Sequence, residues 1–333
     1  MKIVTTPIIV VIGVIGNTLS FLVMKSKPLR HKSYSHYLCA LSLFDTLTLL
    51  TRLTGALDEY YIHESQPGLF NNFTDVTCKL YNFFAHVVAL MSAWIVTLMA
   101  IERLIAVCLP FKKTFLRTQC GSVTTIVILL CCVCTSQAFR LFMIKHVIYD
   151  KSHSIKDCLA SEEYVSIYTG LQVYYYLWTL IFILPVGVVL VCNSLVLRQI
   201  LRVRREFYRE TNSTVNRTVR QRQRSTYMLL FVTFAYVFTL LPMFLLTFII
   251  DLSIKVQSKE RAGHIFVVLS PFLNLTECIA LINYGMNFFI YVVSGKSFRF
   301  QLRRTCVFTK RLMEKRTFGG RTRSTREDFL RLQ

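Results

Sequence analysis

The sequence predicts an all-α membrane protein in which seven helices cross the bilayer. Hydrophobic residues make up 53% of the 333-residue chain, which is more than a soluble domain usually carries, because such a domain must face water. The apolar residues gather in seven continuous runs and do not alternate with polar ones. Continuous runs exclude a β-barrel and favour spanning helices of about 20 residues each.

The seven runs follow one another along the chain, each bounded by polar or charged segments. Helices are expected at about residues 7–25, 36–57, 78–109, 121–143, 167–199, 225–251 and 268–293. The first run follows Lys2 and could instead be a signal peptide. No small-residue cleavage site follows this run, and a basic cluster does, which favours a spanning helix.

Charge differs between alternate connections. The segments after the first, third, fifth and seventh runs hold most of the 39 basic residues, namely Lys25, Lys27, Arg30 and Lys32; Arg103, Lys112, Lys113 and Arg117; Arg198 through Arg224; and Lys296 through Arg331. The other connections carry acidic residues. Because cytoplasmic loops carry the excess of Lys and Arg, we expect the amino terminus outside and the carboxyl tail inside. A net charge of +21 could also indicate nucleic-acid binding, but such a module does not carry seven apolar runs.

Outside one apolar run, the eleven cysteines form no C-x-x-C pair of the kind found in zinc sites, so a zinc site is not expected. Cys131, Cys132 and Cys134 lie inside one apolar run, where we expect them to pack. Cys78 and Cys158 lie in polar surroundings on the side expected outside, where a disulfide could form.

Asp45 is an ionisable residue in the middle of the second run. A charge there is costly, so Asp45 is a functional candidate. Asn17, Ser92, Asn283 and Asn287 are polar residues in the middle of other runs. Together these side chains could bind a small hard cation such as Na⁺, or they could form a hydrogen-bonded network with water and no ion.

Glu102 and Arg103 are an adjacent acid and base near the end of the third run. Taken alone, they fit an ordinary pair at a membrane boundary, with the Arg side chain reaching the interface. The chain continues as E-R-L-I-A-V-C-L-P from Glu102 to Pro110. This segment resembles the E/D-R-Y-x-A-V-x-x-P signature of rhodopsin-like (class A) G-protein-coupled receptors.

Further motifs in the family's order extend the resemblance over about residues 7–306. They are Gly16-Asn17, L-S-L-F-D ending at Asp45, Pro185, Pro242, Asn287 to Tyr291 (N-F-F-I-Y), and Ser297-Phe298-Arg299, which resembles the start of an amphipathic eighth helix. The resemblance also implies a disulfide between Cys78 and Cys158. We therefore expect residues 1–306 to form a seven-transmembrane helix bundle with an amphipathic eighth helix, and residues 307–333 to form a basic, disordered cytoplasmic tail.

The resemblance implies a plasma-membrane receptor, not an enzyme, that activates a heterotrimeric G protein. An agonist would shift an equilibrium between helix arrangements, so that the sixth helix swings outward and a cytoplasmic cleft opens. Arg103 would be the switch residue, restrained by Glu102, with Asn287 and Tyr291 as further parts. Cys306 could be palmitoylated and hold the eighth helix against membrane lipid, or it could be a plain thiol.

Five positions depart from the family pattern. Leu104 replaces the usual Tyr, Phe288 the usual Pro and Leu240 a frequent Trp, while Tyr236 stands for Phe and Asn193 for Tyr. These residues put the wiring of the switch in question but not the fold.

The expected ligand is an extracellular peptide. Ala85 stands where similar amine receptors carry an Asp, and Leu281 stands where opsins carry the Schiff-base Lys, so neither ligand class fits. The pocket is expected to contain Arg52, Arg140 and Glu277 together with His86, Met243, Phe244 and Thr247. Glu277 would bind a basic ligand residue, and Arg52 or Arg140 an acidic or amide group. Alternatively, Arg52 and Glu277 pair with each other.

Other interpretations remain open. The N-F-F-I-Y variant, Asn193 and Arg140 resemble invertebrate neuropeptide receptors of the FMRFamide-receptor kind. Leu104, Phe288 and Leu240 would also fit a receptor-like protein that does not couple. An ion channel or transporter could use Asp45, although the sequence lacks inverted repeats and interrupted helices.

Overall fold

The computed structural model describes residues 2–64, 66–109, 114–150, 155–207, 213–256, 259–295 and 298–305. Its long helices are α1 (Lys2–Met24), α2 (Ser33–His63), α3 (Asp75–Cys108), α4 (Gln119–Gln137), α7 (Leu184–Phe207), α8 (Ser213–Val256) and α9 (Lys259–Ser294). Shorter elements are η1 (Leu69–Asn72), η2 (Phe115–Arg117), α5 (Arg140–Met143), η3 (Glu162–Tyr164), α6 (Val165–Gly170) and the π-helix η4 (Leu171–Ile183). Residues 298–305 form a further short helix.

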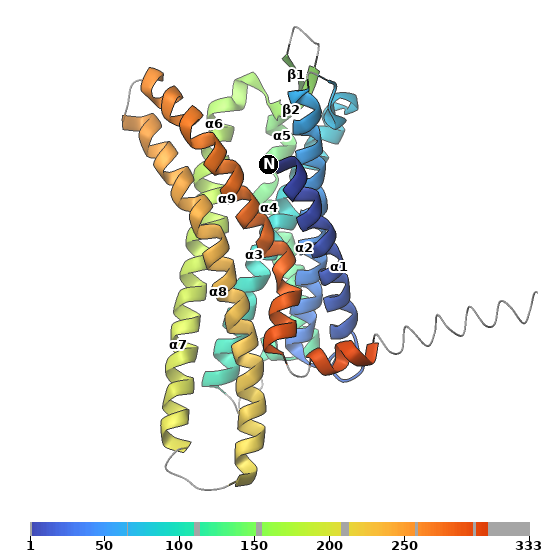
Figure 1. The fold of residues 1–333 in the computed structure, drawn as a ribbon, viewed down its shortest axis with the longest axis vertical. Coiled ribbons are helices and arrows are strands. Elements are labelled where there is room, and N and C mark those ends of the chain that lie inside the picture. Colours follow the sequence, from blue (N-terminus) through green and yellow to red (C-terminus); the bar gives the residue numbers. More distant parts are fainter. Residues whose placement is uncertain are drawn as a thin grey trace, which may run out of the picture.

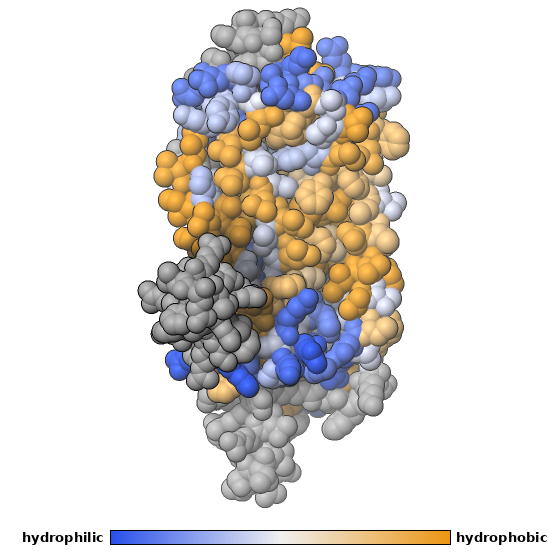
Figure 2. Space-filling view, turned by 90° about the vertical axis from the view of Figure 1, so that its right-hand side faces the viewer, coloured by the Kyte–Doolittle hydropathy of each residue, from blue (hydrophilic) through white to orange (hydrophobic). Residues whose placement is uncertain are grey.

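The prediction of seven spanning helices is confirmed. Within the described ranges, seven helical segments are long and apolar enough to cross a membrane. They run along the long axis of the molecule (Figure 1). A space-filling view shows a belt of hydrophobic side chains between two hydrophilic ends (Figure 2), which is the surface that a bilayer requires.

The first apolar run is an integral part of the bundle, as expected of a spanning helix. Helix α1 packs against both α2 and α9. Two glycines allow the approach to α9, because a Cβ added at Gly285 would lie 3.2 Å from Cα of Gly13. Nearby, a Cβ added at Gly16 would lie 3.0 Å from Cβ of Phe288. The Phe that replaces the family's usual Pro therefore packs against a glycine.

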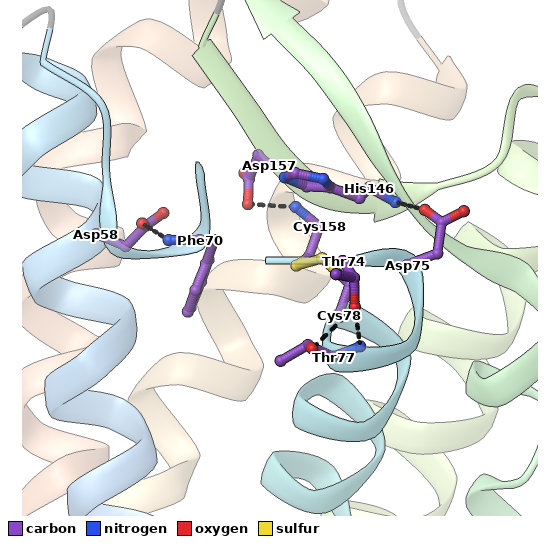
Figure 3. Close-up of a disulfide and its surroundings, with 9 residues drawn as sticks. All are labelled: Asp58, Phe70, Thr74, Asp75, Thr77, Cys78, His146, Asp157 and Cys158. Carbon is purple, nitrogen blue, oxygen red and sulfur yellow. Dashed lines mark hydrogen bonds between the residues drawn. A yellow bond between two sulfur atoms is a disulfide. The ribbon is translucent and has the colours of Figure 1, made fainter. Parts of the chain in front are cut away.

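A β-hairpin at one end of the bundle was not predicted from the sequence. Strand β1 (Ile144–Asp150) pairs antiparallel with β2 (Ile155–Ala160), and His146 lies opposite Cys158. The predicted disulfide between Cys78 and Cys158 is present and ties β2 to the start of α3 (Figure 3). The backbone N–H of His146 also donates to Asp75 Oδ1 at 2.7 Å. We call this side of the molecule the hairpin end.

Local capping explains where two of the helices begin. The Thr74 hydroxyl accepts a hydrogen bond from the backbone N–H of Thr77 at the start of α3, and Thr118 does the same for Gly121 at the start of α4. Such caps satisfy backbone donors that have no partner inside the helix.

The short helix 298–305 lies at the opposite end and confirms the predicted eighth helix (Figure 1). The Phe298 side chain is buried and its ring packs 5.5 Å from that of Tyr291. The Arg299 guanidinium donates to the carbonyls of Val292 and Val293, which are at the end of α9. Cys306 and the tail 307–333 lie outside the described residues, so their predicted roles are untested.

Candidate functional site

A cavity of about 350 Å³ opens between the helices in the hairpin half of the bundle. Its walls come from α1, α2, α3, η4, α8 and α9, with Phe70 of η1 above. Five of the seven predicted ligand residues line it, namely Arg52, His86, Met243, Phe244 and Glu277. Leu281, which replaces the Schiff-base Lys of opsins, and Leu240 line it as well.

Arg52 is a positively charged residue that lines this cavity. Among the described residues, its guanidinium makes no hydrogen bond or salt bridge, although Tyr81, Tyr176 and Tyr284 line the same space. The alternative in which Arg52 pairs directly with Glu277 is not formed, since these two described residues share no salt bridge in the structure. A cation with unused donors inside a helix bundle calls for an acceptor from elsewhere.

An aromatic wall lies on the side formed by η4 and α8. Phe244 stacks on Phe182 with ring centroids 3.8 Å apart and planes 9° apart, and Trp178 meets Phe244 at 5.9 Å. Thr247, which was predicted to be a ligand residue, does not line the cavity. Its hydroxyl instead donates to the carbonyl of Met243, 2.9 Å away in the same helix.

Arg140, also predicted to be a ligand residue, lies behind the cavity wall and does not line it. Its side chain is fully buried, and its donors go to neutral acceptors on α3, α4, α6 and η4. These are Gln137 Oε1 (3.1 Å), Asn82 Oδ1 (3.3 Å), the Tyr168 hydroxyl (2.8 Å) and Gln172 Oε1 (2.5 Å). Three rings, of Phe139, Tyr168 and Tyr176, lie within 5.6 Å of the guanidinium.

Below the cavity, three of the residues predicted as a cation site meet in one cluster. The Asp45 carboxylate is fully buried and accepts hydrogen bonds from Ser92 Oγ and from Asn287 Nδ2, the latter at 2.7 Å. Asn283 makes no side-chain hydrogen bond to another described residue, and Asn17 donates to the carbonyl of Tyr284. The cluster has oxygen atoms of the kind that Na⁺ prefers, and direct hydrogen bonds already hold it together.

At the end opposite the hairpin, Arg103 forms an ion pair with the adjacent residue Glu102. Arg103 Nε and Nη2 each lie 2.6 Å from Glu102 Oε2. Ser33, the first residue of α2, donates to Glu102 Oε1 at 2.9 Å, and the Tyr34 ring lies 5.0 Å from the guanidinium. Both charged groups are buried, so this ion pair is shielded from water. Sequence analysis did not find Ser33 or Tyr34, because a contact between separate helices has no sequence signal.

Two departures from the family pattern make hydrogen bonds of their own. The carbonyl of Ile181 lies in the π-helix η4 and faces α8. The Tyr236 hydroxyl from α8 donates to that carbonyl. In the same way, Asn193 Nδ2 donates to Thr233 Oγ1 at 2.8 Å. These replacements join the fifth spanning segment to α8, so they are compatible with an ordered bundle.

The predicted switch residue Tyr291 is fully buried beside Phe298. Its hydroxyl has no hydrogen-bond partner among the described residues. A buried hydroxyl without a partner is costly, and this leaves Tyr291 with a hydrogen bond to gain in another arrangement of the helices.

Comparisons with known proteins agree with this architecture. The model of the family described as 7 transmembrane receptor (rhodopsin family) matches residues 16–291. Growth hormone secretagogue receptor type 1 of Rattus norvegicus is 25% identical over 325 residues, which cover 96% of this chain and 82% of that receptor. A galanin-like G-protein coupled receptor of Caenorhabditis elegans is 24% identical over 88% of this chain and 70% of its own. The FMRFamide receptor of Drosophila melanogaster is 25% identical over 88% of this chain and 51% of its own.

Proposed function

Because the chain belongs to the rhodopsin family of seven-transmembrane receptors, we propose that it binds an extracellular peptide and activates a heterotrimeric G protein. The family makes it a multi-pass plasma-membrane receptor and not an enzyme. The proposed orientation puts the hairpin end outside and the helix 298–305 in the cytoplasm, in agreement with the excess of Lys and Arg on that side.

A peptide ligand is supported by the relatives and by the cavity. The relatives are named as receptors for a growth hormone secretagogue, as galanin-like and as a receptor for FMRFamide. The observation that carries the proposal is the Arg52 guanidinium, which lines the cavity and makes no hydrogen bond or salt bridge with another described residue. A ligand carboxylate or terminal amide oxygen would accept its hydrogen bonds, and such charge-assisted bonds are strong where water is excluded.

Glu277 on α9 is the proposed contact for a basic ligand residue. It lines the same cavity as Arg52, so one short peptide with a basic residue near an acidic or amide group can meet both. The rings of Phe182, Phe244 and Tyr176 would pack against its apolar side chains.

Transmission to the G protein would begin from the closed pair of Arg103 and Glu102. Agonist binding would favour an arrangement in which this ion pair opens, α8 moves outward and Arg103 meets the G protein. In the same transition Asn287 would change its hydrogen-bond partner and the Tyr291 hydroxyl would gain one. We propose Na⁺ as an allosteric ligand of the Asp45 cluster, and membrane lipid as a contact of the basic inner surface.

A receptor-like protein that does not couple is the second candidate. Leu104, Phe288 and Leu240 favour it, since they replace residues that the family usually carries at the switch.

The test is a screen of short peptides, each as free acid and as terminal amide, in cells that express the receptor with calcium and cyclic-AMP reporters. We expect at least one peptide that contains a basic residue to give a response that depends on the receptor. The Glu277→Lys variant should lose this response at equal surface expression. Unchanged potency in that variant would overturn the assignment of Glu277, and silence across the library would favour the non-coupling candidate.

A further inference from the structure

Behind the cavity wall, a directed chain of hydrogen bonds leads from Arg140 to His86. Arg140 Nη2 lies 2.5 Å from Gln172 Oε1, Gln172 Nε2 lies 3.4 Å from His86 Nε2, and His86 Nδ1 lies 2.7 Å from the backbone carbonyl of Asn82. Arg140 and Gln172 are outside the lining of the cavity, whereas His86 is part of it.

The chemistry of the two ends fixes the direction of every bond between them. A guanidinium only donates, so the Gln172 amide must present its oxygen to Arg140 and its NH₂ group to His86. A backbone carbonyl only accepts, so His86 Nδ1 must carry a proton. His86 Nε2 therefore faces a donor and can take part only as an unprotonated acceptor.

The surroundings of His86 offer no compensation for a second proton. The cations Arg140 on α5 and Arg52 on α2 act electrostatically on the ring, and Tyr176 on η4 packs against it edge to face at 4.9 Å. No carboxylate of the described residues makes a hydrogen bond or salt bridge with the ring. The second proton would make the ring a third positive charge beside these two cations, which is unfavourable.

We propose that Arg140 is a positioning residue that acts through Gln172 to hold His86 as a neutral imidazole with its proton on Nδ1. Both ring nitrogens are then used by the protein. At His86 the ligand meets only carbon edges and the ring face, so this part of the cavity takes an aromatic or aliphatic ligand side chain. This consequence rests on the peptide-receptor function proposed above, but the state of His86 does not.

The state of His86 can be observed without any ligand. The full-length receptor, labelled with ¹⁵N-histidine and placed in lipid nanodiscs, gives imidazole nitrogen shifts that distinguish the two neutral tautomers from the charged form. The His86 signals are assigned by their loss in His86→Gln. We expect one neutral form with the proton on Nδ1 from about pH 5 to pH 8, the range in which an ordinary imidazole changes charge.

Two variants should change the protonation of His86 by altering the hydrogen bonds between Arg140, Gln172 and His86. Gln172→Glu keeps the side-chain shape but replaces the donor that faces His86 with an acceptor, so His86 should gain a proton on Nε2. Arg140→Met removes the cation and lets the Gln172 amide turn, so His86 should become charged at the acidic end of the range. Arg140→Lys should restore the native signals.

Gln137→Met is the matched control, because Gln137 contacts Arg140 but not Gln172 or His86, and its His86 spectrum should equal that of the native protein. The proposal is overturned if native His86 carries its proton on Nε2 or is charged near neutral pH. It is equally overturned if Gln172→Glu leaves the His86 signals unchanged, which can be judged even if Arg140→Met does not fold. A receptor without a peptide agonist would defeat the proposed function but leave this measurement intact.

Discussion

Arg52 in the hairpin half and Arg103 at the opposite end both lie on membrane-spanning helices, but among the described residues Arg103 forms a salt bridge and Arg52 forms none. Arg103 is held by Glu102, Ser33 and Tyr34, whereas Arg52 faces a cavity with its donors unused by the described residues. The hydrogen-bonding capacity of Arg103 is thus met within the protein, whereas the donors of Arg52 remain available to a bound molecule. Under the proposed function, a ligand would complete the first region and a rearrangement would open the second.

The largest expected effect tests the open region. Replacing Arg52 by Met should lower peptide potency by about 30-fold or more, because losing one partner of a desolvated, hydrogen-bonded charge pair costs about 2 kcal/mol or more. Potency is measured in reporter cells at matched surface expression. Lys145→Met is the control, since Lys145 is an exposed cation on β1 of the same end, and its potency should not change. Equal potency of Arg52→Met and the native receptor would contradict the assignment.

Breaking the ion pair between Glu102 and Arg103 should increase signalling, whereas the Arg52 substitution decreases it. Glu102→Gln removes the charge that holds Arg103, and hydrogen bonds to charged groups contribute about 1.5–3 kcal/mol. We expect agonist-independent nucleotide exchange on the G protein to rise about tenfold, measured with purified receptor. Basal exchange equal to that of the native receptor would show that the pair does not restrain the resting state.

The close contact between α1 and α9 should stabilise the bundle, and substitutions at two glycines test this. Gly285→Ala places a Cβ against the backbone of Gly13, which we expect to lower stability by about 1–3 kcal/mol, as overpacking does. Gly187→Ala is the control, because an added Cβ there meets no atom within 4 Å, and it should be neutral or slightly stabilising. Thermal unfolding of the two purified variants measures the difference. Equal melting temperatures would argue against a tight contact.

The smallest expected effect isolates one hydrogen bond of the closed region. Ser33→Ala removes the donor to Glu102 Oε1 but leaves the ion pair, so basal exchange should rise only about fivefold, for a loss of about 1 kcal/mol. Ser35→Ala is the matched control, because Ser35 lies two residues further along α2 and bonds to Met24 instead. If both variants behave alike, Ser33 has no specific role.

The sequence was sufficient for the parts of the fold that hydropathy and motif order determine. The seven helices, the disulfide and the short helix at Phe298 were predicted, and the Glu102–Arg103 pair was identified from its motif. The hairpin at 144–160 was missed because the apolar run into Met143 was extended up to it.

The sequence identified candidate site residues, but it could not show which of them line the cavity. Arg140 was expected in the ligand pocket because an Arg in a spanning helix suggests function, but its four acceptors come from four separate elements that the sequence does not place together. Arg52 carries the same signal and does line the cavity. Which of these two cations is satisfied by its own chain depends on tertiary packing, and it cannot be deduced from either residue or its spacing.

The most direct test of the account is nucleotide exchange with purified components, namely the receptor in nanodiscs, a heterotrimeric G protein and a peptide found by the library screen. We expect the peptide to accelerate nucleotide exchange by the native receptor. The Arg52→Met variant should require a higher peptide concentration. The Arg103→Ala variant should still bind the peptide but should no longer accelerate exchange. A peptide that binds through Arg52 and accelerates exchange on no class of G protein would contradict the claim that the cavity controls the closed ion pair.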